Sequence, residues 1–543
     1  MGSHTLRRPI MARLALRSLL TVPVAGAALA GPAAAQAPAD RVDAAFARLA
    51  GPATPGCAVG VARGGQPVLQ RAYGMADLEG DRPNTPETVF EAGSVTKQVT
   101  AAAVVLLALD GRFALEDDAR RWLPELPRYE RPITIRHLLT HTSGLRDWGS
   151  VAALTGWPRG TRAYATPDML AIVARQRTLN YPVGDHYSYT NSGYSLLAVL
   201  VERASGMPFA EFTRTRLFAP LGMASTQWRD DYTRIVKGRA IAYEPAAPGP
   251  AASGAFRLDM PFESVVGNGG LLTTVGDLLR WTQNLETGAV GGPRFLAAMH
   301  RQARLTSGRQ IEYASGLFVT SWRGIPEVSH SGSTGGYRAF LARYPQQRVT
   351  VAVLCNAAHA NATALAHQVA DAYLGDAPTD VATRAAATGA TGGDTTGAVP
   401  PAGLYRDVRT GAALRVAGTR GPAGRWVAQQ APGGRTTWLR LAADGDTVRY
   451  EPMAPATPTA RDLAAYAGRW RSEDAEATWQ VRAAGDTLLL RDPRGRETPL
   501  VPAWRDAFTA AGTVWRFERD AAGRVVRLVA SQDRVWAMPF TRS

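Results

Sequence analysis

The amino-acid sequence predicts an α/β (α+β) protein whose antiparallel sheet is flanked by helices, followed by an all-β C-terminal domain that is a barrel or a sandwich. Three observations support this fold class. Strand-like segments stand at both ends of residues 40–376, with helix-like segments between them. Residues 377–400 have mostly small side chains, which is typical of a flexible linker. Residues 401–543 consist of short segments that alternate apolar and polar side chains, separated by turns rich in Gly and Asp.

The elements of the first domain follow from hydrophobic periodicity and from turn and capping residues. Residues 57–69 predict a hairpin with two glycines at its turn. The other predicted elements are helices at 99–109, from Thr166 onward, at 194–204 before Gly206 and at 359–374, and paired strands at 337–344 and 349–354. Because strands and helices do not alternate regularly, we expect an antiparallel sheet built from both ends of the domain.

The composition excludes several classes of protein. With 543 residues, of which 45% are hydrophobic and 20% charged, the chain can form several packed domains. Two cysteines are too few for a disulfide scaffold or a Cys-based zinc module. The net charge of +15 is spread along the chain rather than gathered in basic runs with interleaved aromatic residues, so we expect no nucleic-acid partner.

Residues 1–37 are typical of a secretory signal peptide. Arg13 and Arg17 precede an apolar run at 19–29, and A-x-A cleavage sites end at Ala35 and Ala37. The apolar run is too short to span a membrane, and no other segment has 18 uninterrupted apolar residues. We therefore expect a periplasmic or secreted protein with no membrane span after cleavage.

Ser94 and Lys97 form the first candidate catalytic pair. Residues three apart share a helix face, so the hydroxyl and the amine can meet. A serine hydroxyl becomes a good nucleophile when a base takes its proton. Lysine can be that base when burial lowers its pKa, whereas arginine keeps its proton. An exposed lysine at a helix start is the alternative, but Lys97 opens the most apolar helical segment of its domain, and Lys237 is the only other lysine.

Tyr189 and Asn191 stand just before the predicted helix at 194–204. A phenol beside a cationic lysine has its phenolate form favoured, so Tyr189 could relay a proton. Asn191 could orient the lysine or a substrate amide. A plain helix cap is the alternative for these residues.

A third motif, His330-Ser331-Gly332, lies before the predicted strand at 337–344. A strand edge here could place the backbone N–H of Ser333 opposite that of Ser94, and two such donors form an oxyanion hole. We therefore assign His330, Gly332 and Ser333, together with Asn191, to substrate and oxyanion binding.

The three motifs, in this order, resemble those of the serine β-lactamase and penicillin-binding-protein family, closest to its class C, D,D-carboxypeptidase, D-aminopeptidase and esterase branch. Segments 133–145 and 269–277 are also similar to that family, and the resemblance covers about residues 45–375. It implies a β-lactamase-like fold with a helical subdomain and an acyl-enzyme mechanism on Ser94, with no cofactor. The β tail is similar to the extra domains of D-aminopeptidase-like members, which implies that it covers or shapes the cleft. A module that binds the cell wall or a partner is the alternative for this tail.

The third motif departs from the K-T-G of class C β-lactamases. A neutral imidazole attracts a substrate carboxylate less than an ammonium does. This favours a D-amino-acid peptidase or esterase, acting on a small peptide, amide or ester, over a β-lactamase that hydrolyses β-lactams. A non-catalytic protein that binds peptidoglycan or another partner is a third hypothesis, against which the complete set of Ser94, Lys97 and Tyr189 argues.

Two further residue pairs have ordinary interpretations. His137 and His141 are spaced as in a zinc helix, but Leu138 stands where H-E-x-x-H needs Glu, so we expect no metal site. Cys57 and Cys355 lie in predicted strands near the two ends of the domain, and either a disulfide or two buried thiols is possible.

Overall fold

The computed structural model describes residues 37–247, 255–375, 399–417, 425–430, 436–441 and 447–543. The predicted signal peptide and the predicted linker therefore lie almost entirely outside the described residues. Within the described ranges, no helix is both long and apolar enough to cross a bilayer.

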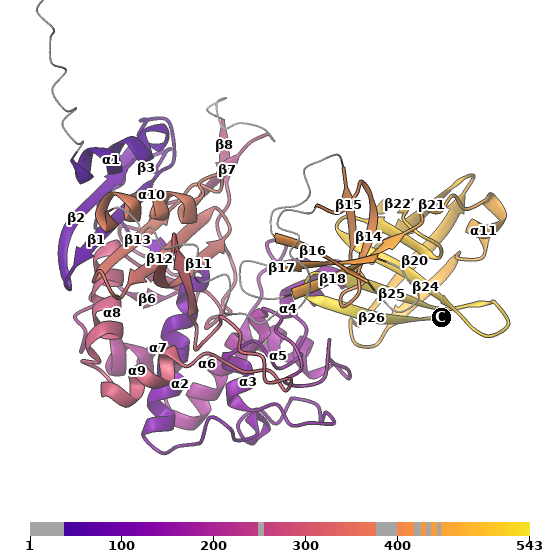
Figure 1. Cartoon of the computed structure of the whole chain (residues 1–543), viewed down its shortest axis with the longest axis horizontal. Coiled ribbons are helices and arrows are strands. Elements are labelled where there is room, and N and C mark those ends of the chain that lie inside the picture. The colour runs from indigo at the N-terminus through magenta and orange to yellow at the C-terminus, as the bar shows by residue number, and fades with distance from the viewer. Residues whose placement is uncertain (1–36, 248–254, 376–398, 418–424, 431–435, 442–446) are drawn as a thin grey trace, which may run out of the picture. The chain divides into compact units, whose positions relative to one another are not determined.

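The main sheet has six antiparallel strands in the order β10-β11-β12-β13-β1-β2 (Figure 1). Their bounds are β1 Cys57–Arg63, β2 Gln66–Tyr73, β10 Phe318–Trp322, β11 Ile325–Thr334, β12 Tyr337–Tyr344 and β13 Val349–Cys355. Strand β1, from the start of the domain, pairs with β13, from its end. The predicted hairpin, the predicted pair of strands and the antiparallel sheet built from both ends of the domain are thus confirmed.

Helices cover both faces of this sheet. Side chains of α1 (Pro38–Phe46) and α10 (Ala362–Leu374) pack with alternate residues of β13, among them Val351 and Val353. On the other face, α8 (Val275–Thr287) approaches so closely that a Cβ atom on Gly60 would lie 3.2 Å from side-chain atoms of α8. Every residue of β13 is buried, as expected of a central strand covered on both faces.

The helical part of the domain lies between β2 and β10 in the sequence. Helix α2, Thr96–Leu109, has twelve buried residues, and α6, Asn191–Ser205, ends at Gly206 with φ +74°. The remaining helices are α3 Ile135–Leu139, α4 Trp148–Leu154, α5 Thr166–Ala174, α7 Phe209–Thr213 and α9 Gly292–His300, with short helical turns η1 Ala47–Leu49, η2 Gly93–Val95, η3 Ala119–Arg121 and η4 Arg214–Phe218. The short strands are β3 Met75–Asp77, β4 Arg82–Pro83, β5 Phe90–Glu91, β6 Gln227–Trp228, β7 Tyr243–Pro245, β8 Phe256–Leu258 and β9 Leu271–Thr273.

Three predicted helix starts differ from the structure by three residues each, because α2 begins at Thr96 rather than at 99, α6 begins at Asn191 rather than at 194, and α10 begins later than expected. The residues Thr166-Pro167-Asp168 also suggest Thr166 as the N-cap of α5. Helix α10 begins at Ala362 rather than at residue 359, because Asn361 caps it and accepts a 3.0 Å hydrogen bond from Ala364 N. Helix α5 begins at Thr166 as predicted, but Thr166 is not its cap. The Asp168 carboxylate instead accepts a hydrogen bond from Ala165 N, 2.9 Å away.

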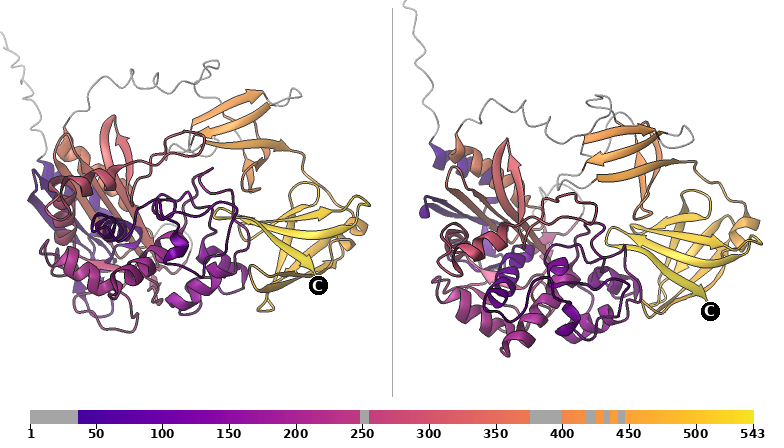
Figure 2. Two further views of the ribbon diagram at one scale, coloured as in Figure 1. Left: turned by 90° about the horizontal axis from the view of Figure 1, so that it is seen from below. Right: turned by 60° about the horizontal axis from the view of Figure 1, so that its bottom comes forward.

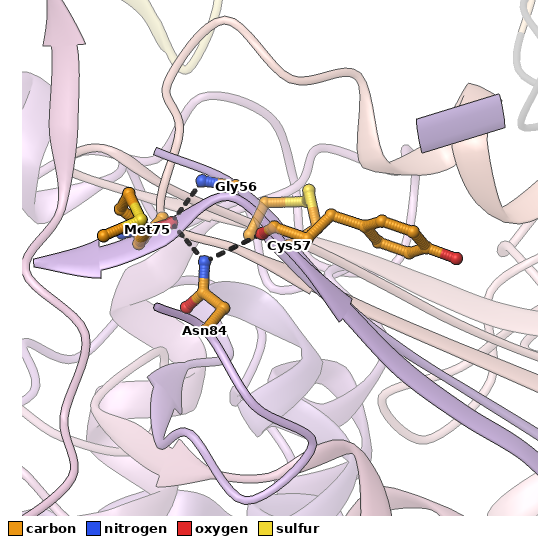
Figure 3. Close-up of a disulfide and its surroundings, with 7 residues drawn as sticks. Gly56, Cys57, Met75 and Asn84 are labelled. Atoms are coloured by element: carbon orange, nitrogen blue, oxygen red, sulfur yellow. Dashed lines mark hydrogen bonds between the residues drawn. A yellow bond between two sulfur atoms is a disulfide. The ribbon is translucent and has the colours of Figure 1, made fainter. Parts of the chain in front are cut away.

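Cys57 and Cys355 form a disulfide between neighbouring strands (Figure 3). The two residues are in register in the β1–β13 pair, which explains why their side chains meet. Beside them, Gly56 N donates a 2.8 Å hydrogen bond to Asn356 Oδ1, and Asn84 Nδ2 donates one of 3.0 Å to Tyr73 O. Of the two possibilities that the sequence left open, the structure has the disulfide.

The C-terminal region is all-β, as predicted, and the structure divides it into two strand assemblies (Figure 2). The first is a five-stranded sheet of β14 Gly403–Asp407, β15 Ala413–Val416, β16 Arg425–Gln430, β17 Thr436–Leu441 and β18 Thr447–Met453. The second is a closed barrel of β19 Gly468–Ser472, β20 Ala477–Ala484, β21 Thr487–Arg491, β22 Glu497–Pro502, β23 Ala507–Ala510, β24 Thr513–Arg519, β25 Val525–Gln532 and β26 Val535–Arg542, preceded by the short helix α11 Ala460–Ala464.

Candidate active site

Ser94 and Lys97 lie next to each other at the start of α2. Ser94 belongs to the helical turn η2, and Lys97 is in the first turn of the helix. Lys97 Nζ is 3.0 Å from Ser94 Oγ, so the sequence spacing brings the two groups together as expected. The Lys97 side chain is fully buried, in contrast to an ordinary surface lysine.

The other contacts of Lys97 determine what its amine can do. Nζ donates hydrogen bonds to Asn191 Oδ1 at 3.0 Å and to the backbone oxygen of Asn268 at 2.7 Å. Both oxygens are acceptors only. A neutral amine has two N–H bonds and one lone pair, so these oxygens take both N–H groups. The lone pair is then left for the Ser94 hydroxyl, which is the arrangement that a general base requires.

The surroundings of Lys97 favour this neutral form. Burial is the main cause that holds the pKa of Lys97 well below its ordinary value, because a buried charge loses its hydration. The positive charges of Arg534 and Arg159 lower this pKa further, while the Asp147 carboxylate raises it. Burial dominates, so the amine is poised to accept a proton.

Tyr189 and Asn191 enter the site from the segment that leads into α6. Thr190 caps this helix, accepting a hydrogen bond from Ser192 N, and Asn191 is its first residue. The Tyr189 ring centroid is 4.8 Å from Lys97 Nζ. Asn191 N donates a 2.7 Å hydrogen bond to Asp147 Oδ2, which fixes the start of the helix.

The protonation expected for Tyr189 is the reverse of the expectation from sequence. Burial raises the pKa of Tyr189, and the Ser94 side chain only partly opposes this effect. The argument for a phenolate took Lys97 as a cation, whereas burial holds the pKa of Lys97 well below its ordinary value. Tyr189 is therefore a phenol, which suits it to donate a proton rather than to take one.

The third motif precedes β12, as predicted, and itself lies within strand β11. The strand passes so close to η2 that a Cβ atom on Gly332 would lie 2.1 Å from Ala92 O, and one on Gly93 would lie 2.5 Å from Ser333 N. Glycine is required at both positions for this approach. The backbones of Ser94 and Ser333 thereby meet at one cavity, where the sequence predicts the two donors of an oxyanion hole.

His330 is buried and already has a partner at each ring nitrogen. Nδ1 donates to Ser331 O at 2.6 Å, because a carbonyl oxygen can only accept, and Nε2 therefore accepts from the Tyr313 hydroxyl at 3.1 Å. Burial lowers the pKa of His330 to about 3. The third motif thus contributes a neutral imidazole, as the sequence analysis assumed.

One cavity of about 470 Å³ brings the predicted site residues together. It is lined by Gly93, Ser94, Arg159, Tyr187, Tyr189, Asn191, Asn268, Gly269, Phe318, His330, Ser331, Ser333, Thr334 and Arg534. Lys97 lies beneath this surface with its amine against Ser94. Gly332, which was also predicted from the third motif, does not line the cavity. It lies against the residues that lead into and form η2.

Four residues that sequence reasoning missed contribute to the site. Asn268 O binds Lys97, and Asp147 anchors Asn191. Arg159 and Arg534 line the cavity, the latter from the C-terminal barrel. Asn268 directly precedes the segment at 269–277 that resembles the family, and this position was a usable signal for it. No signal distinguished Arg159 or Arg534 among so many arginines.

The two histidines with zinc-like spacing have structural contacts. His137 takes part in the cap of α3, with its Nδ1 atom 3.1 Å from Thr134 N. His141 is buried and stacks near Tyr189, with ring centroids 4.3 Å apart. Among the described residues, no cluster of three or more His, Cys, Asp or Glu side chains could hold a metal ion.

Comparison with known proteins agrees with this geometry. The beta-lactamase family model matches residues 42–375, which is more than half of the chain. A D-aminopeptidase of Cereibacter sphaeroides is 29% identical over 82% of this chain and 87% of its own length. A penicillin-binding protein of Bacillus subtilis is 30% identical over 54% of this chain and 66% of its own length.

A solved structure extends the likeness of the fold into the C-terminal region. The octameric penicillin-binding protein homologue of Pyrococcus abyssi superposes with a TM-score of 0.54 over 93% of this chain and 99% of its own, at 19% identity. The motifs, the sheet with its helices and the family match lead to one conclusion: the chain belongs to the beta-lactamase family of serine hydrolases.

Proposed function

We propose that this protein is an exported hydrolase that acylates Ser94 and cleaves a peptide, amide or ester bond of a D-amino-acid substrate. The observation that carries the proposal is the environment of the Lys97 amine. Two oxygen acceptors bind Nζ, which lies 3.0 Å from Ser94 Oγ, so that in the neutral amine the lone pair is left for the Ser94 hydroxyl. A non-catalytic binding protein would have no need of a fully buried, neutral lysine at this position.

The chemistry follows from these contacts. Ser94 Oγ attacks the carbonyl carbon of the substrate while its proton passes to Lys97 Nζ. The backbone N–H groups of Ser94 and Ser333 bind the oxyanion that forms. The bond to the leaving amine or alcohol then breaks, and the leaving group takes the proton from Lys97 Nζ, either directly or through the Tyr189 phenol, which gives its own proton and is reprotonated by Lys97. Water then attacks the acyl group and gives a proton to Lys97 Nζ. As the bond between the acyl carbon and Ser94 Oγ breaks and the acid leaves, Lys97 passes this proton to Oγ and restores the hydroxyl.

The substrate class is supported by the relatives and by the third motif. The relative of Cereibacter sphaeroides that shares most of its length with this chain is named a D-aminopeptidase. His330 offers a neutral ring where class C β-lactamases carry a lysine, which argues against β-lactams as the main substrate.

A hydrolysis panel tests the proposal. It contains a short-chain p-nitrophenyl ester, a D-Ala-D-Ala peptide, a D-amino-acid amide with its L-enantiomer, and nitrocefin. The proposal predicts turnover of the ester and of a D-amino-acid compound, little turnover of the L-enantiomer, and none in Ser94→Ala. Faster turnover of nitrocefin than of every amide and peptide would instead identify a β-lactamase.

Export to the periplasm or medium is part of the proposal. It rests on the charged and apolar pattern of residues 1–37. The disulfide between Cys57 and Cys355 supports it, since such bonds persist in oxidising compartments. Fractionation of the native host, with detection of a mature chain that begins near residue 36 or 38, is the test.

A further inference from the structure

A hairpin of the C-terminal barrel brings an arginine to the catalytic cavity. Strands β25 and β26 are joined by Asp533 and Arg534. The Arg534 guanidinium carbon lies 4.9 Å from the centroid of the Tyr189 ring, and Arg534 lines the same cavity as Ser94. This arginine is far from every catalytic motif in the sequence, and nothing in the proposed chemistry uses it.

Backbone contacts, rather than the arginine side chain, hold this hairpin in place. Arg534 O accepts hydrogen bonds from Asp147 N and from Asn180 Nδ2, both at 3.2 Å. Trp536 N donates to Asn180 Oδ1 at 2.8 Å, and the Trp536 ring lies 4.9 Å from that of Tyr181. Asp147 also anchors Asn191, so the hairpin and the second motif share one support.

The charges around the cavity are not balanced. Arg159, the other arginine of the lining, forms a two-point ion pair with the buried Glu263. Arg534 has only Asp533 as an ion-pair partner among the described residues, at 3.6 Å, and the Asp533 side chain is 93% exposed. No Asp or Glu is among the described residues that line the cavity. A solvated partner of this kind neutralises a charge only weakly, so Arg534 leaves the cavity positive.

We propose that the cavity selects substrates that carry a carboxylate, and that the Arg534 guanidinium binds this carboxylate. This inference rests on the proposed function and makes its substrate class more specific. Arginine is suited to the role, because its planar group can donate two parallel hydrogen bonds to a carboxylate. The third motif has no cation to offer, since His330 already uses both ring nitrogens. A substrate with a free ammonium group would meet the same positive charge and be disfavoured.

Two matched substrate series test the inference. The first compares acetyl-D-Ala-D-Ala with its C-terminal amide. The second compares the succinyl, acetyl and unmodified forms of D-alanine p-nitroanilide, which are anionic, neutral and cationic near the scissile bond. The variants are Arg534→Gln, which removes the charge, and Arg534→Lys, which keeps it. Arg524→Gln is the control, because Arg524 stands at another hairpin of the same barrel and pairs with Asp520.

The expected result is a charge-dependent loss. In the wild type, the carboxylate member of at least one series has the highest kcat/KM. Compared on the pH-independent plateau of each profile, Arg534→Gln lowers that value by roughly 10- to 100-fold, as for a lost charged hydrogen bond, and lowers the values of the neutral members much less. Arg534→Lys keeps part of the preference, and Arg524→Gln behaves as the wild type. An equal change for all members, or a wild-type preference for the ammonium form, would overturn the inference.

A binding measurement separates this inference from the proposed function. Calorimetry with Ser94→Ala compares acetyl-D-Ala-D-Ala and its amide, with and without Arg534→Gln. The inference predicts tighter binding of the carboxylate, lost with Arg534, whether or not the wild-type enzyme turns the peptide over. Binding that ignores the carboxylate, or no binding of either compound, overturns it. Failure of Ser94 to react with any acylating probe instead contradicts the proposed function.

Discussion

The carboxylate of Asp147 accepts a hydrogen bond of 2.7 Å from the backbone N–H of Asn191. Asn191 in turn accepts from Lys97 Nζ, so Asp147 positions the second motif against the base. Asp147 N binds Arg534 O as well, which ties the barrel hairpin to the same point. Two residues of opposite charge therefore stand near Lys97, and they act on its pKa in opposite directions.

This opposition predicts the pH dependence of two variants. Activity requires the neutral amine, so it falls as pH drops through the pKa of Lys97. Arg534 lowers that pKa, so Arg534→Gln should move the acidic limb of the kcat/KM profile to higher pH. Asp147 raises it, so Asp147→Asn should move the limb to lower pH. The profiles are measured with a neutral p-nitrophenyl ester, so that substrate charge does not contribute. Shifts of the same sign in both variants would contradict the assignment of Lys97 as the titrating group.

Conversion of the base to a permanent cation should abolish most activity. Lys97→Arg keeps a positive group in the site but cannot take the proton of Ser94. We expect kcat/KM for the ester to fall by roughly 10²- to 10⁴-fold, as for a lost acid–base group. Unchanged far-UV circular dichroism is the control for folding. Activity within a few-fold of the wild type would rule out a lysine base.

The barrel should contribute to stability through a buried ion pair. Arg146 and Asp474 are 3.3 Å apart, with side chains only 2% and 7% exposed. Asp474→Ala leaves the buried guanidinium without its carboxylate, so we expect a loss of about 3–5 kcal/mol in the free energy of unfolding. Glu476→Gln on the same turn is the matched control. It removes the exposed pair with Arg175 and should cost less than about 1 kcal/mol in urea denaturation. An equally small loss of unfolding free energy in both variants would show that the ion pair between Arg146 and Asp474 does not stabilise the fold.

Loss of the disulfide should lower stability without changing the site. Cys57 and Cys355 are separated by 298 residues in the sequence, so their bond restricts the unfolded chain strongly. The Cys57→Ala/Cys355→Ala double variant should lose about 2–5 kcal/mol, measured by urea denaturation. Ester hydrolysis at 25 °C should be close to that of the wild type, because neither cysteine lines the cavity. A double variant as stable as the wild type would show that the bond does not form in solution.

The sequence allowed prediction of those parts of the site that follow from local pattern. Ser94 and Lys97 are three residues apart at a helix start, so their contact needs only local structure. The order of the three motifs predicted that Tyr189 and His330 would share their cavity. The cap of α10 at Asn361 was also present in the sequence, four residues before Leu365, and would have corrected the start of that helix.

The rest of the site depends on contacts between distant segments. Asn268 O reaches Lys97 across 171 residues of sequence, and Arg534 comes from a hairpin of a different strand assembly. The position of Asn268 next to the segment at 269–277 marks its neighbourhood, but nothing in the sequence marks its backbone oxygen as a partner of Lys97. Arg534 carries no local signal, because one turn arginine looks like another in sequence. The expectation of a phenolate at Tyr189 also failed because it depended on a contact between distant segments. Full burial of Lys97 is a tertiary property, and it lowers the pKa of the amine that the argument for a phenolate treated as a cation.

The central claim is that Ser94 is the nucleophile and that the neutral Lys97 amine activates it. Intact-protein mass spectrometry after a fluorophosphonate probe tests this most directly, with peptide mapping of the modified residue and with Ser94→Ala and Lys97→Arg alongside. The account predicts one adduct in the wild type, located on Ser94, none in Ser94→Ala, and labelling slowed by at least tenfold in Lys97→Arg. An adduct on a different residue, or labelling of Ser94→Ala at the wild-type rate, would contradict it.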